Sequence, residues 1–597
     1  MFKGHPKGLF VAFFTNMGER FGFYTMMAIL VLFLQARYGL TEAQAGDYYS
    51  WFYFAIYALA LIGGLLADWT KKYKLIILLG QIIMFAGYTI IAIPGMPLTI
   101  ALLGLFTIAL GNGLFKGNLQ AVVGQLYDDE KYSKMRDSAF MVFYMGINIG
   151  AFFAPFFATG VRNWWLKSHG FLHDGSIPAL CHQFKNGTMT DTSQFADLAS
   201  KADLNHVYAN NLAGFADTYL NIFSQGYNYA FALAACAMVI SLFVYLIFNK
   251  SLPNKEKVEV AAVKNEKVNS GVTPILIALS LIAASAIAFN YLMDNYKLGL
   301  AIGLFLGFAS WIFLASTKEE KPRVTALLLV YVVVIFFWMS FHQNGLTLTF
   351  FARDYTVKEV GPLTFLFFNL ESILCVIATI AGIVMILSDN KEKKNKLIGA
   401  GITAIFGAVC FYLIGTYSTK NPISPEVFQS FNPLFIVALT PLVMGFFSKL
   451  NQKGIEPTTP RKIGLGMIIA SIGFLIVLVV SINLVSPYLL GGVAPGPEGR
   501  VSPYWLMSSY LILTIAELFL SPMGLSFVSK VAPVRFQGLM QGGWLLATAV
   551  GNKLLFIGSL LWGKIDLYLL WGMFLICCMI SAVFIFSIMK RLESATK

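Results

Sequence analysis

The sequence predicts an all-α protein that crosses a membrane many times, and its composition and its long apolar stretches are the observations that predict this. Hydrophobic residues make up 57% of the 597-residue chain, whereas only 12% of its residues are charged. That charged share is about half the usual one in soluble proteins. A soluble domain could not bury so much apolar side chain, so the composition excludes soluble enzymes, and it excludes disordered chains as well.

About sixteen apolar stretches reach the roughly 20 residues that a helix needs to cross a bilayer. The first six precede a charged linker and lie near 9–36, 47–67, 75–94, 97–126, 137–160 and 226–248. The others follow it and lie near 272–293, 298–316, 324–351, 363–387, 397–417, 430–449, 463–485, 503–528, 538–562 and 567–589. An even number of spans places both termini on one side of the membrane.

Basic loops indicate which side faces the cytoplasm, because Lys and Arg are enriched in cytoplasmic loops. With the N-terminus in the cytoplasm, the loops on that side are mostly basic, and the linker 249–271 alone holds five lysines. The loop near 126–137 is acidic and is the exception. The net charge of +13 therefore fits cytoplasmic loops of a membrane protein, and nucleic acid is not an expected partner.

The longest loop on the other side, about 161–225, is polar and near-neutral. It holds four of the six histidines, and His169 and His173 have the i, i+4 spacing that suits metal ligands on a helix. No CxxC-type pair accompanies them. We therefore expect a solvated extracytoplasmic insert and no metal.

Ionisable side chains within spans are costly and mark functional sites by default. The candidates are Glu19 and Arg20 in the first span, Lys116 in the fourth, Glu371 about nine residues into the tenth, and Glu517 in the fourteenth. The alternative is that ion pairs only hold helices together, and Glu19 with Arg20 suits such a pair. Lys116 has no acidic neighbour in its own helix, which favours a substrate or a partner on another helix.

Five segments carry longer motifs, namely ERFGFY at 19–24, GGLLADWTKK at 63–72, FYMGINIG at 143–150, QSFNPLFI at 429–436 and ELFLSPMGLS at 517–526. The second is similar to the signature loop of major facilitator transporters, in which Asp68 is a gate residue. Together the segments resemble the proton-dependent oligopeptide transporter (POT or PTR) family of the major facilitator superfamily. The resemblance covers roughly 1–160, 226–350 and 425–590.

The resemblance implies a major facilitator fold, with two six-helix bundles that alternate access to a central site and two extra helix pairs. The pair near 272–316 is typical of bacterial members. The pair near 363–417 departs from the family pattern, and we expect it to be peripheral. The expected organisation is helices 1–5 of the N-terminal bundle over 1–160, the insert over 161–225, helix 6 over 226–248, a linker with the first extra pair over 249–323, helix 7 over 324–352, the second extra pair over 353–428, and helices 8–12 over 429–597.

The resemblance also implies a function, the import of di- and tripeptides by proton symport across a bacterial inner membrane. Such a protein is not an enzyme, needs no cofactor, works as a monomer in the lipid bilayer and has both termini in the cytoplasm. A weakly coupled or uncoupled facilitator for another small anion or metabolite is the alternative. A membrane-embedded enzyme or a sensor is disfavoured, because the sequence has no nucleophile–base constellation and no cytoplasmic signalling domain.

By the same resemblance, eight residues form the peptide site. Arg20 and Lys116 face the peptide carboxylate, and Glu517 faces its amino group. Asn148 and Asn432 are expected to hydrogen-bond the peptide backbone. Tyr24, Tyr57 and Trp544 are expected to form aromatic walls that accept many side chains. Tyr57 and Trp544 taken alone would suit an ordinary core equally well.

The proton relay departs from the family pattern. Asn16 stands where the family has a glutamate, and an amide cannot carry a proton. We expect the Asn16 amide to hydrogen-bond Arg20 one turn away, and coupling to be looser than in relatives with the full motif. The remaining candidates for proton coupling are Glu19, Arg20, Lys116 and His342.

Overall fold

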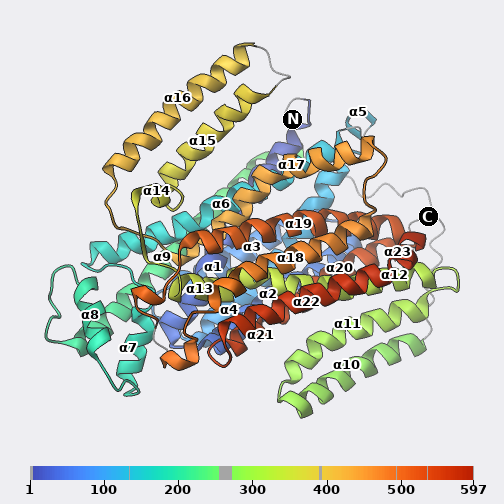
Figure 1. Cartoon of the computed structure of the whole chain (residues 1–597). Coiled ribbons are helices and arrows are strands. Elements are labelled where there is room, and N and C mark those ends of the chain that lie inside the picture. Colours follow the sequence, from blue (N-terminus) through green and yellow to red (C-terminus); the bar gives the residue numbers. More distant parts are fainter. Residues whose placement is uncertain are drawn as a thin grey trace.

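The structure is a computed structural model that describes residues 4–128, 130–133, 135–253, 272–388, 393–491, 494–533 and 536–595. Helices dominate it (Figure 1), and the described residues contain sixteen helical spans that are long and apolar enough to cross a bilayer. The prediction of an all-α polytopic membrane protein is therefore confirmed. Most lysines of the predicted basic linker lie in 254–271, outside the described residues.

The N-terminal bundle consists of α1 (Lys7–Tyr38), α2 (Glu42–Thr70), α3 (Tyr73–Ala92), α4 (Leu98–Gln125), α6 (Arg136–Ser168) and α9 (Leu212–Phe248), with short α5 (Glu130–Ser133) and η1 (Asn249–Ser251) on its connections. Glycines let these helices approach closely. A Cβ atom added to Gly63 would lie 2.2 Å from the Gly113 carbonyl oxygen, and one added to Gly80 would lie 2.7 Å from that of Gly111. Helix α4, which carries Lys116, is thus held tightly between α2 and α3.

Three spans of the C-terminal bundle are composite: α12 (Lys321–Phe341) continues through η2 (His342–Gly345) into α13 (Thr347–Asp354), η3 (Pro425–Ser430) leads into α17 (Phe431–Gln452), and α20 (Gln537–Lys553) is followed by α21 (Phe556–Leu561). The other three spans are the single helices α18 (Thr459–Ser481), α19 (Pro503–Val531) and α22 (Leu567–Ser587). The short helix α23 (Met589–Ala595) follows the bundle. Short η4 (Pro487–Leu490) and η5 (Pro497–Gly499) lie between α18 and α19. Two of its spans are therefore interrupted, one at η2 and one between α20 and α21.

A small helical domain, here called the cap (residues 169–211), covers one end of the molecule (Figure 1). It contains α7 (Ile177–Lys185) and α8 (Ser193–Ala202) around a buried aromatic core that includes Phe171 and Phe195. The two flanking spans extend into the predicted insert 161–225, since α6 continues to Ser168 and α9 begins at Leu212. Both chain termini lie away from the cap (Figure 1), so we call the two ends of the molecule the cap end and the termini end.

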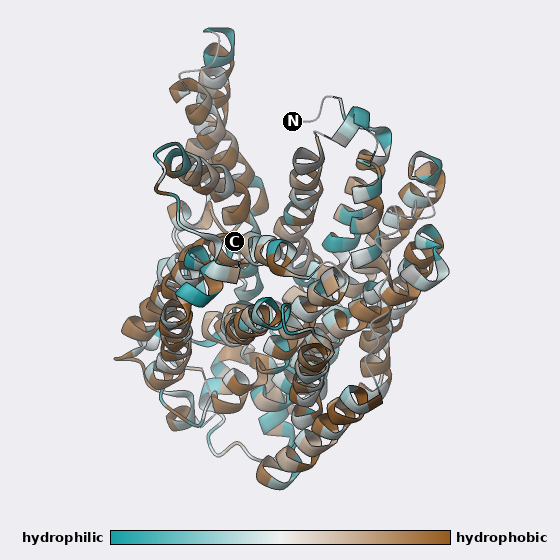
Figure 2. Ribbon diagram, turned by 90° about the vertical axis from the view of Figure 1, so that its right-hand side faces the viewer, coloured by the Kyte–Doolittle hydropathy of each residue, from teal (hydrophilic) through white to brown (hydrophobic). Residues whose placement is uncertain are grey.

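Two helix pairs lie outside the bundles, α10 (Val272–Met293) with α11 (Tyr296–Ala315), and α15 (Leu370–Leu387) with α16 (Lys393–Thr416). The second pair projects away from the bundles (Figure 1), and apolar residues colour most of its length (Figure 2). Only 6% of the apolar window of α16 is buried within the protein. A two-residue antiparallel ribbon of β1 (Glu359–Val360) and β2 (Asn421–Pro422) joins the chain on either side of the pair.

The structure corrects the expected position of Glu371. Short α14 (Pro362–Phe365) ends before a bend, and α15 begins only at Leu370. The side chain of Asn369 caps α15 by accepting a hydrogen bond of 2.9 Å from the Glu371 backbone N–H. Glu371 therefore lies exposed in the first helical turn, where an acidic side chain suits the helix dipole, and not deep within a span.

Candidate functional site

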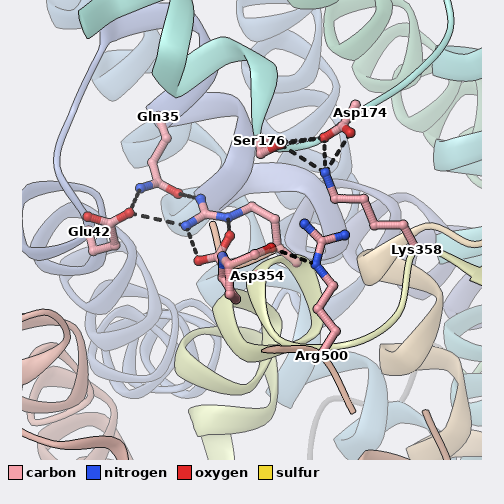
Figure 3. Close-up of polar contacts among 9 residues, drawn as sticks. Gln35, Glu42, Asp174, Ser176, Asp354, Lys358 and Arg500 are labelled. Atoms are coloured by element: carbon pink, nitrogen blue, oxygen red, sulfur yellow. Dashed lines mark hydrogen bonds and ion pairs between the residues drawn. The ribbon is translucent and has the colours of Figure 1, made fainter. Parts of the chain in front are cut away.

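Ion pairs between the two bundles gather at the cap end, on both sides of α13 (Figure 3). The Arg353 guanidinium donates 2.7 Å to Gln35 Oε1 and lies 3.2 Å from the Glu42 carboxylate, so it joins α13 to α1 and α2. Close by, the Lys358 ammonium pairs with the Asp174 carboxylate of the cap and donates to the Ser176 hydroxyl at 2.9 Å. The cap is therefore anchored to the C-terminal bundle.

Two further pairs join the bundles at this end. Arg162 of α6 pairs with Glu426 of η3, and both side chains are fully buried. Lys553 at the end of α20 pairs with Asp47 at the start of α2 and donates to the Ser50 hydroxyl at 3.1 Å. Four cross-bundle ion pairs thus clamp the cap end.

The electrostatics of Asp174 keep its pair charged. Burial alone would raise the pKa of this carboxyl, but Lys358 and the hydrogen bonds from Ser176 outweigh burial and lower the pKa to about 2. Burial also holds the pKa of the neighbouring His173 well below its ordinary value, so this imidazole is neutral. At neutral pH the contact between the cap and Lys358 is therefore a full ion pair.

The termini end differs. There, Lys462 pairs with Glu456 and Arg461 pairs with Glu593 at 2.8 Å, and all four residues belong to the C-terminal half of the chain. The four cross-bundle ion pairs described above lie at the cap end. They hold the two bundles together at this end of the molecule.

Between these ends, Arg20 and Glu19 form a bidentate ion pair, with Nε to Oε2 at 2.5 Å and a second contact of 2.7 Å to Oε1. The Asn112 amide of α4 donates to the same Oε1 at 2.8 Å. The predicted bond between Asn16 and Arg20 is wrong, because the guanidinium donates to Glu19 and no hydrogen bond joins it to the Asn16 amide oxygen among the described residues. The guanidinium forms an ion pair with Glu19 instead, and a hydrogen bond from the Asn112 amide fixes the Glu19 carboxylate.

Lys116 approaches the same region from α4. Its ammonium lies 4.4 Å from the centroid of the Tyr57 ring, a cation–π contact, and it lies within electrostatic range of Arg20 and Glu19. Among the described residues, Lys116 has no ion-pair partner within 4 Å. The structure thus places a cation that lacks a carboxylate beside an arginine that already has one.

Glu517, the predicted anion of the site, lies on α19 in the C-terminal bundle. The Asn432 amide of α17 donates 3.0 Å hydrogen bonds to Glu517 Oε2 and to the Thr514 hydroxyl of α19. Tyr57 lies within electrostatic range of both Arg20 and Glu517, and so does Tyr24. Arg20 of one bundle and Glu517 of the other are therefore both near Tyr24 and Tyr57, and Lys116 contacts the Tyr57 ring.

Three other predicted residues occupy less central positions. The Asn148 amide donates to the Tyr144 carbonyl of its own helix at 3.1 Å. Trp544 is buried, and a Cβ atom added to Gly524 would lie 1.8 Å from its indole, so this ring packs directly on the α19 backbone. Asp68 lies in the last turns of α2, and its side chain is outside the described residues.

His342, the remaining candidate, lies at the interruption between α12 and α13. Its ring packs between Trp338 and Tyr53 of α2, with both centroid distances 4.5 Å. Its Nδ1 lies 2.5 Å from Asn552 Oδ1. Sequence patterns gave no reason to select Asn112, Asn552 or Tyr53, because each acts through a neighbour that only the fold brings close.

The insert histidines have structural surroundings. His182 bonds the Ala36 carbonyl oxygen at 2.9 Å, and the His169 ring packs 4.1 Å from Trp165. Among the described residues, no group of three or more His, Cys, Asp or Glu side chains could hold a metal ion.

Comparison with known proteins identifies relatives of the whole chain. A family model described as the POT family matches residues 74–421 and 413–561. Peptide transporter YePEPT of Yersinia enterocolitica is 26% identical over 92% of this chain and 87% of its own length. Dipeptide and tripeptide permease A of Erwinia pyrifoliae is 26% identical over 91% of this chain and 83% of its own length.

Solved structures agree on the fold. A crystal structure of a mutant of peptide transporter POT in complex with alafosfalin has a TM-score of 0.64 and 24% identity, and the match covers 100% of this chain and 97% of the other. A POT family transporter in complex with 5-aminolevulinic acid has a TM-score of 0.64 and 21% identity, and the match covers 100% and 98% of the two chains.

Proposed function

The chain belongs to the POT family, a family of transporters and not of enzymes, and from this premise we propose that it imports di- and tripeptides by proton symport with alternating access. The observation that carries the proposal is the placement of Arg20 and Lys116 on one bundle and Glu517 on the other, with Tyr57 in contact with Lys116 and within electrostatic range of Arg20 and Glu517. A short peptide is a zwitterion whose carboxylate and ammonium complement these charges.

The roles of the site residues follow from their present partners. Lys116 offers its charge directly to a carboxylate, whereas Arg20 must share its guanidinium between Glu19 and the peptide. Glu517 and Asn432 receive the peptide ammonium and backbone, and Asn148 exchanges its bond to the Tyr144 carbonyl for one to the peptide. Tyr24, Tyr57 and Trp544 present ring surfaces that accept different side chains.

The ion pairs suggest how the site alternates. Four ion pairs join the bundles at the cap end, and we therefore infer access from the termini end, which we assign to the cytoplasm because of the basic loops. The protein is a monomer in a bacterial inner membrane with both termini inside, and Asp68 works in the gate at the cytoplasmic end. Opening to the outside requires the pairs at the cap end to break.

Proton coupling uses the titratable groups that remain. Asn16 cannot titrate, and Glu19 is engaged by Arg20 and Asn112, which leaves Lys116 and His342 as the freer candidates. Asn16 stands where the family has a glutamate, and this difference favours the second candidate function, a weakly coupled or uncoupled facilitator for a small anion or metabolite. Both functions use the same cationic residues.

Uptake of a labelled dipeptide into proteoliposomes tests the proposal. We expect saturable uptake that unlabelled di- and tripeptides inhibit and free amino acids do not, with accumulation that depends on an inward proton gradient and collapses with an ionophore. Saturable uptake without accumulation would support the facilitator. Absence of saturable peptide uptake with and without a pH gradient would refute peptide import.

A further inference from the structure

The cap is attached to the two bundles in different ways. It shares a buried aromatic core with α9 of the N-terminal bundle. Its contacts with the C-terminal half include the Asp174–Lys358 pair (Figure 3) and a hydrogen bond of 3.4 Å from the Gln194 amide to the Ala494 carbonyl. The cap therefore moves with the N-terminal bundle, and these polar contacts must break when the cap end opens.

His173 lies at this contact, directly before Asp174 in the chain. Its ring stacks on Phe223 of α9, with the ring centroids 5.4 Å apart. A Cβ atom added to Gly175 would lie 3.9 Å from His173 Cε1 and 3.3 Å from Arg353 Cγ, so the imidazole lies close to α13 of the C-terminal bundle. The Nε2 atom is buried and has no hydrogen-bond partner among the described residues.

These surroundings oppose a positive charge on the ring. A neutral imidazole can keep its single hydrogen on Nδ1, whereas an imidazolium donates from both nitrogens. Protonation would therefore leave a buried Nε2–H without an acceptor, and it would place a charge near two cations, Arg162 and Lys358. Asp174 favours the charged ring, but Lys358 already binds this carboxylate. Burial first, and then the Arg162 cation, hold the pKa of His173 well below its ordinary value.

The other titratable and charged groups belong to the elements packed around this contact. They are Tyr219 of α9, Glu426 of η3, Arg353 and Asp354 of α13, and Arg500. The two carboxylates among them are engaged, since Glu426 pairs with Arg162 and Asp354 pairs with Arg353.

We propose that His173 makes the cap a pH-sensitive latch, in which protonation of the imidazole on Nε2 releases the cap from the C-terminal half and lets the cap end open. The inference rests on the alternating access of the proposed function and gives the insert a regulatory role in it. On opening, Lys358 and Arg353 move away with the C-terminal bundle and water reaches Nε2, so the open state binds the proton more favourably. The proposed topology places the cap outside, where an inward proton gradient means a lower pH. Acid outside thus favours the conformation that takes up peptide from that side.

The sign of the pH dependence follows from this difference between the two states. The histidine does not oppose closure above its ordinary pKa of about 6.5, and closure weakens as pH falls below that value. Because one proton is bound on opening, the ratio of open to closed protein should rise roughly tenfold between about pH 7.5 and 5.5.

Double electron–electron resonance between labels at Thr192→Cys in the cap and Glu498→Cys in the C-terminal half measures this ratio without peptide, in a protein without its native cysteines. His173→Phe preserves an aromatic ring on Phe223 but cannot titrate, and His173→Gln is a second neutral variant. In both variants the ratio should no longer change with pH. In Asp174→Asn opening should be favoured at every pH, yet the tenfold change should remain because His173 still titrates. His169→Gln is the matched control and should respond as the native residue does, because this exposed histidine bonds the Trp165 carbonyl of the preceding helix.

A ratio that stays constant with pH when His173 is present would overturn the latch, and this outcome needs no His173 variant to fold. A pH response that persists in both His173 variants, or that disappears in His169→Gln, would overturn it as well. Peptide counterflow at equal pH on both sides separates these results from failure of the proposed function, because the label distance needs no peptide. Active counterflow with a constant ratio refutes the latch alone, whereas absence of counterflow in the native protein refutes peptide transport.

Discussion

Charges at the cap end and charges at the centre are paired in opposite ways. At the cap end, Arg162 with Glu426 and Lys358 with Asp174 reach across to the other bundle or to the cap. At the centre, Arg20 binds Glu19 of its own helix, and Glu517 binds Asn432 of its own bundle. The first arrangement resists separation of the bundles, whereas the second leaves the bundles free to move and lets a ligand supply the missing bridge.

This difference indicates how the work is divided. A pair that crosses the interface contributes to the stability of one conformation and must break in each cycle. A charge that is satisfied within its bundle contributes nothing to closure until a zwitterion joins the two sides. We therefore expect changes at the centre to abolish transport and changes at the cap end to alter the balance of conformations.

The largest effect should follow removal of the central cations. Arg20→Gln or Lys116→Met should reduce peptide uptake about 30-fold or more each, since hydrogen bonds to charged groups contribute roughly 1.5–3 kcal/mol. Arg20→Gln also leaves the buried Glu19 carboxylate without its ion-pair partner. Arg20→Lys should fail as well, because lysine cannot reproduce the bidentate contact with Glu19. Arg37→Gln, near the other end of α1, is the control. Full uptake by either central variant would contradict the assigned carboxylate site.

A smaller and more selective effect is expected at Glu517. Glu517→Gln should weaken binding of a free dipeptide by about 1–3 kcal/mol, the range for hydrogen bonds to charged groups. A dipeptide acetylated at its amino end should lose comparatively little, because it has no ammonium to lose. Isothermal titration of both ligands measures the difference. Equal losses would mean that Glu517 only holds α17 and α19 together through Asn432.

At the cap end, Asp174→Asn should favour the conformation open toward the cap by about 1–2 kcal/mol, the contribution of one partly buried charged hydrogen bond. Spin labels are placed at Thr192→Cys in the cap and Glu498→Cys across the interface, in a protein without its native cysteines. Double electron–electron resonance should report a longer distance between the labels in Asp174→Asn than in the protein with Asp174. Lys185→Met, which breaks the exposed pair with Asp217, is the control and should change nothing.

The pH dependence of this contact has a definite sign. The pKa of Asp174 is lowered to about 2, so the pair stabilises the closed cap end above the ordinary carboxyl range and is lost only as pH falls toward that value. Between about pH 5 and 8 the label distance in the native protein should not change with pH through this pair, because Asp174 stays ionised. A distance that changed within that range and lost its pH dependence in Asp174→Asn would contradict the assignment.

Much of the fold could be predicted because a bilayer imposes one simple requirement, namely long apolar helices. The predicted spans match in number, and the motifs identified the family. The errors lie where local chemistry decides a helix boundary. Glu371 was expected within a span, but the Asn369 cap starts α15 just before it. The flanking spans α6 and α9 also extend into the predicted insert.

The site was predictable where charge in an apolar helix is conspicuous, as for Arg20, Lys116 and Glu517. The hydrogen-bond and ion-pair partners of these residues could not be predicted, because they depend on how the helices pack, which sequence spacing does not give. Asn16 was expected to hydrogen-bond Arg20 one turn away, yet the adjacent Glu19 binds the guanidinium. Asn112 and Asn552 gave no signal at all, since a neutral amide within a helix is ordinary until its partner is known.

The smallest effect is expected from the largest change, deletion of the α15–α16 pair. This pair takes no part in either class of ion pair among the described residues, and most of its length is exposed within the protein, although Ser372 and Ile373 at the start of α15 are buried. The chain enters and leaves it side by side, since Val360 pairs with Asn421 in the β1–β2 ribbon. Replacing 376–409 by a short turn keeps the ribbon and keeps Phe368 packed on Phe428 and Phe431. It should therefore leave peptide affinity within about twofold, because surface changes away from packed features usually cost less than about 0.5 kcal/mol. Affinity is to be measured on monodisperse protein, with the α10–α11 pair intact as an internal reference. Loss of binding in such protein would mean that the pair supports α17, and through Asn432 the central site, so that the centre depends on a region outside both bundles.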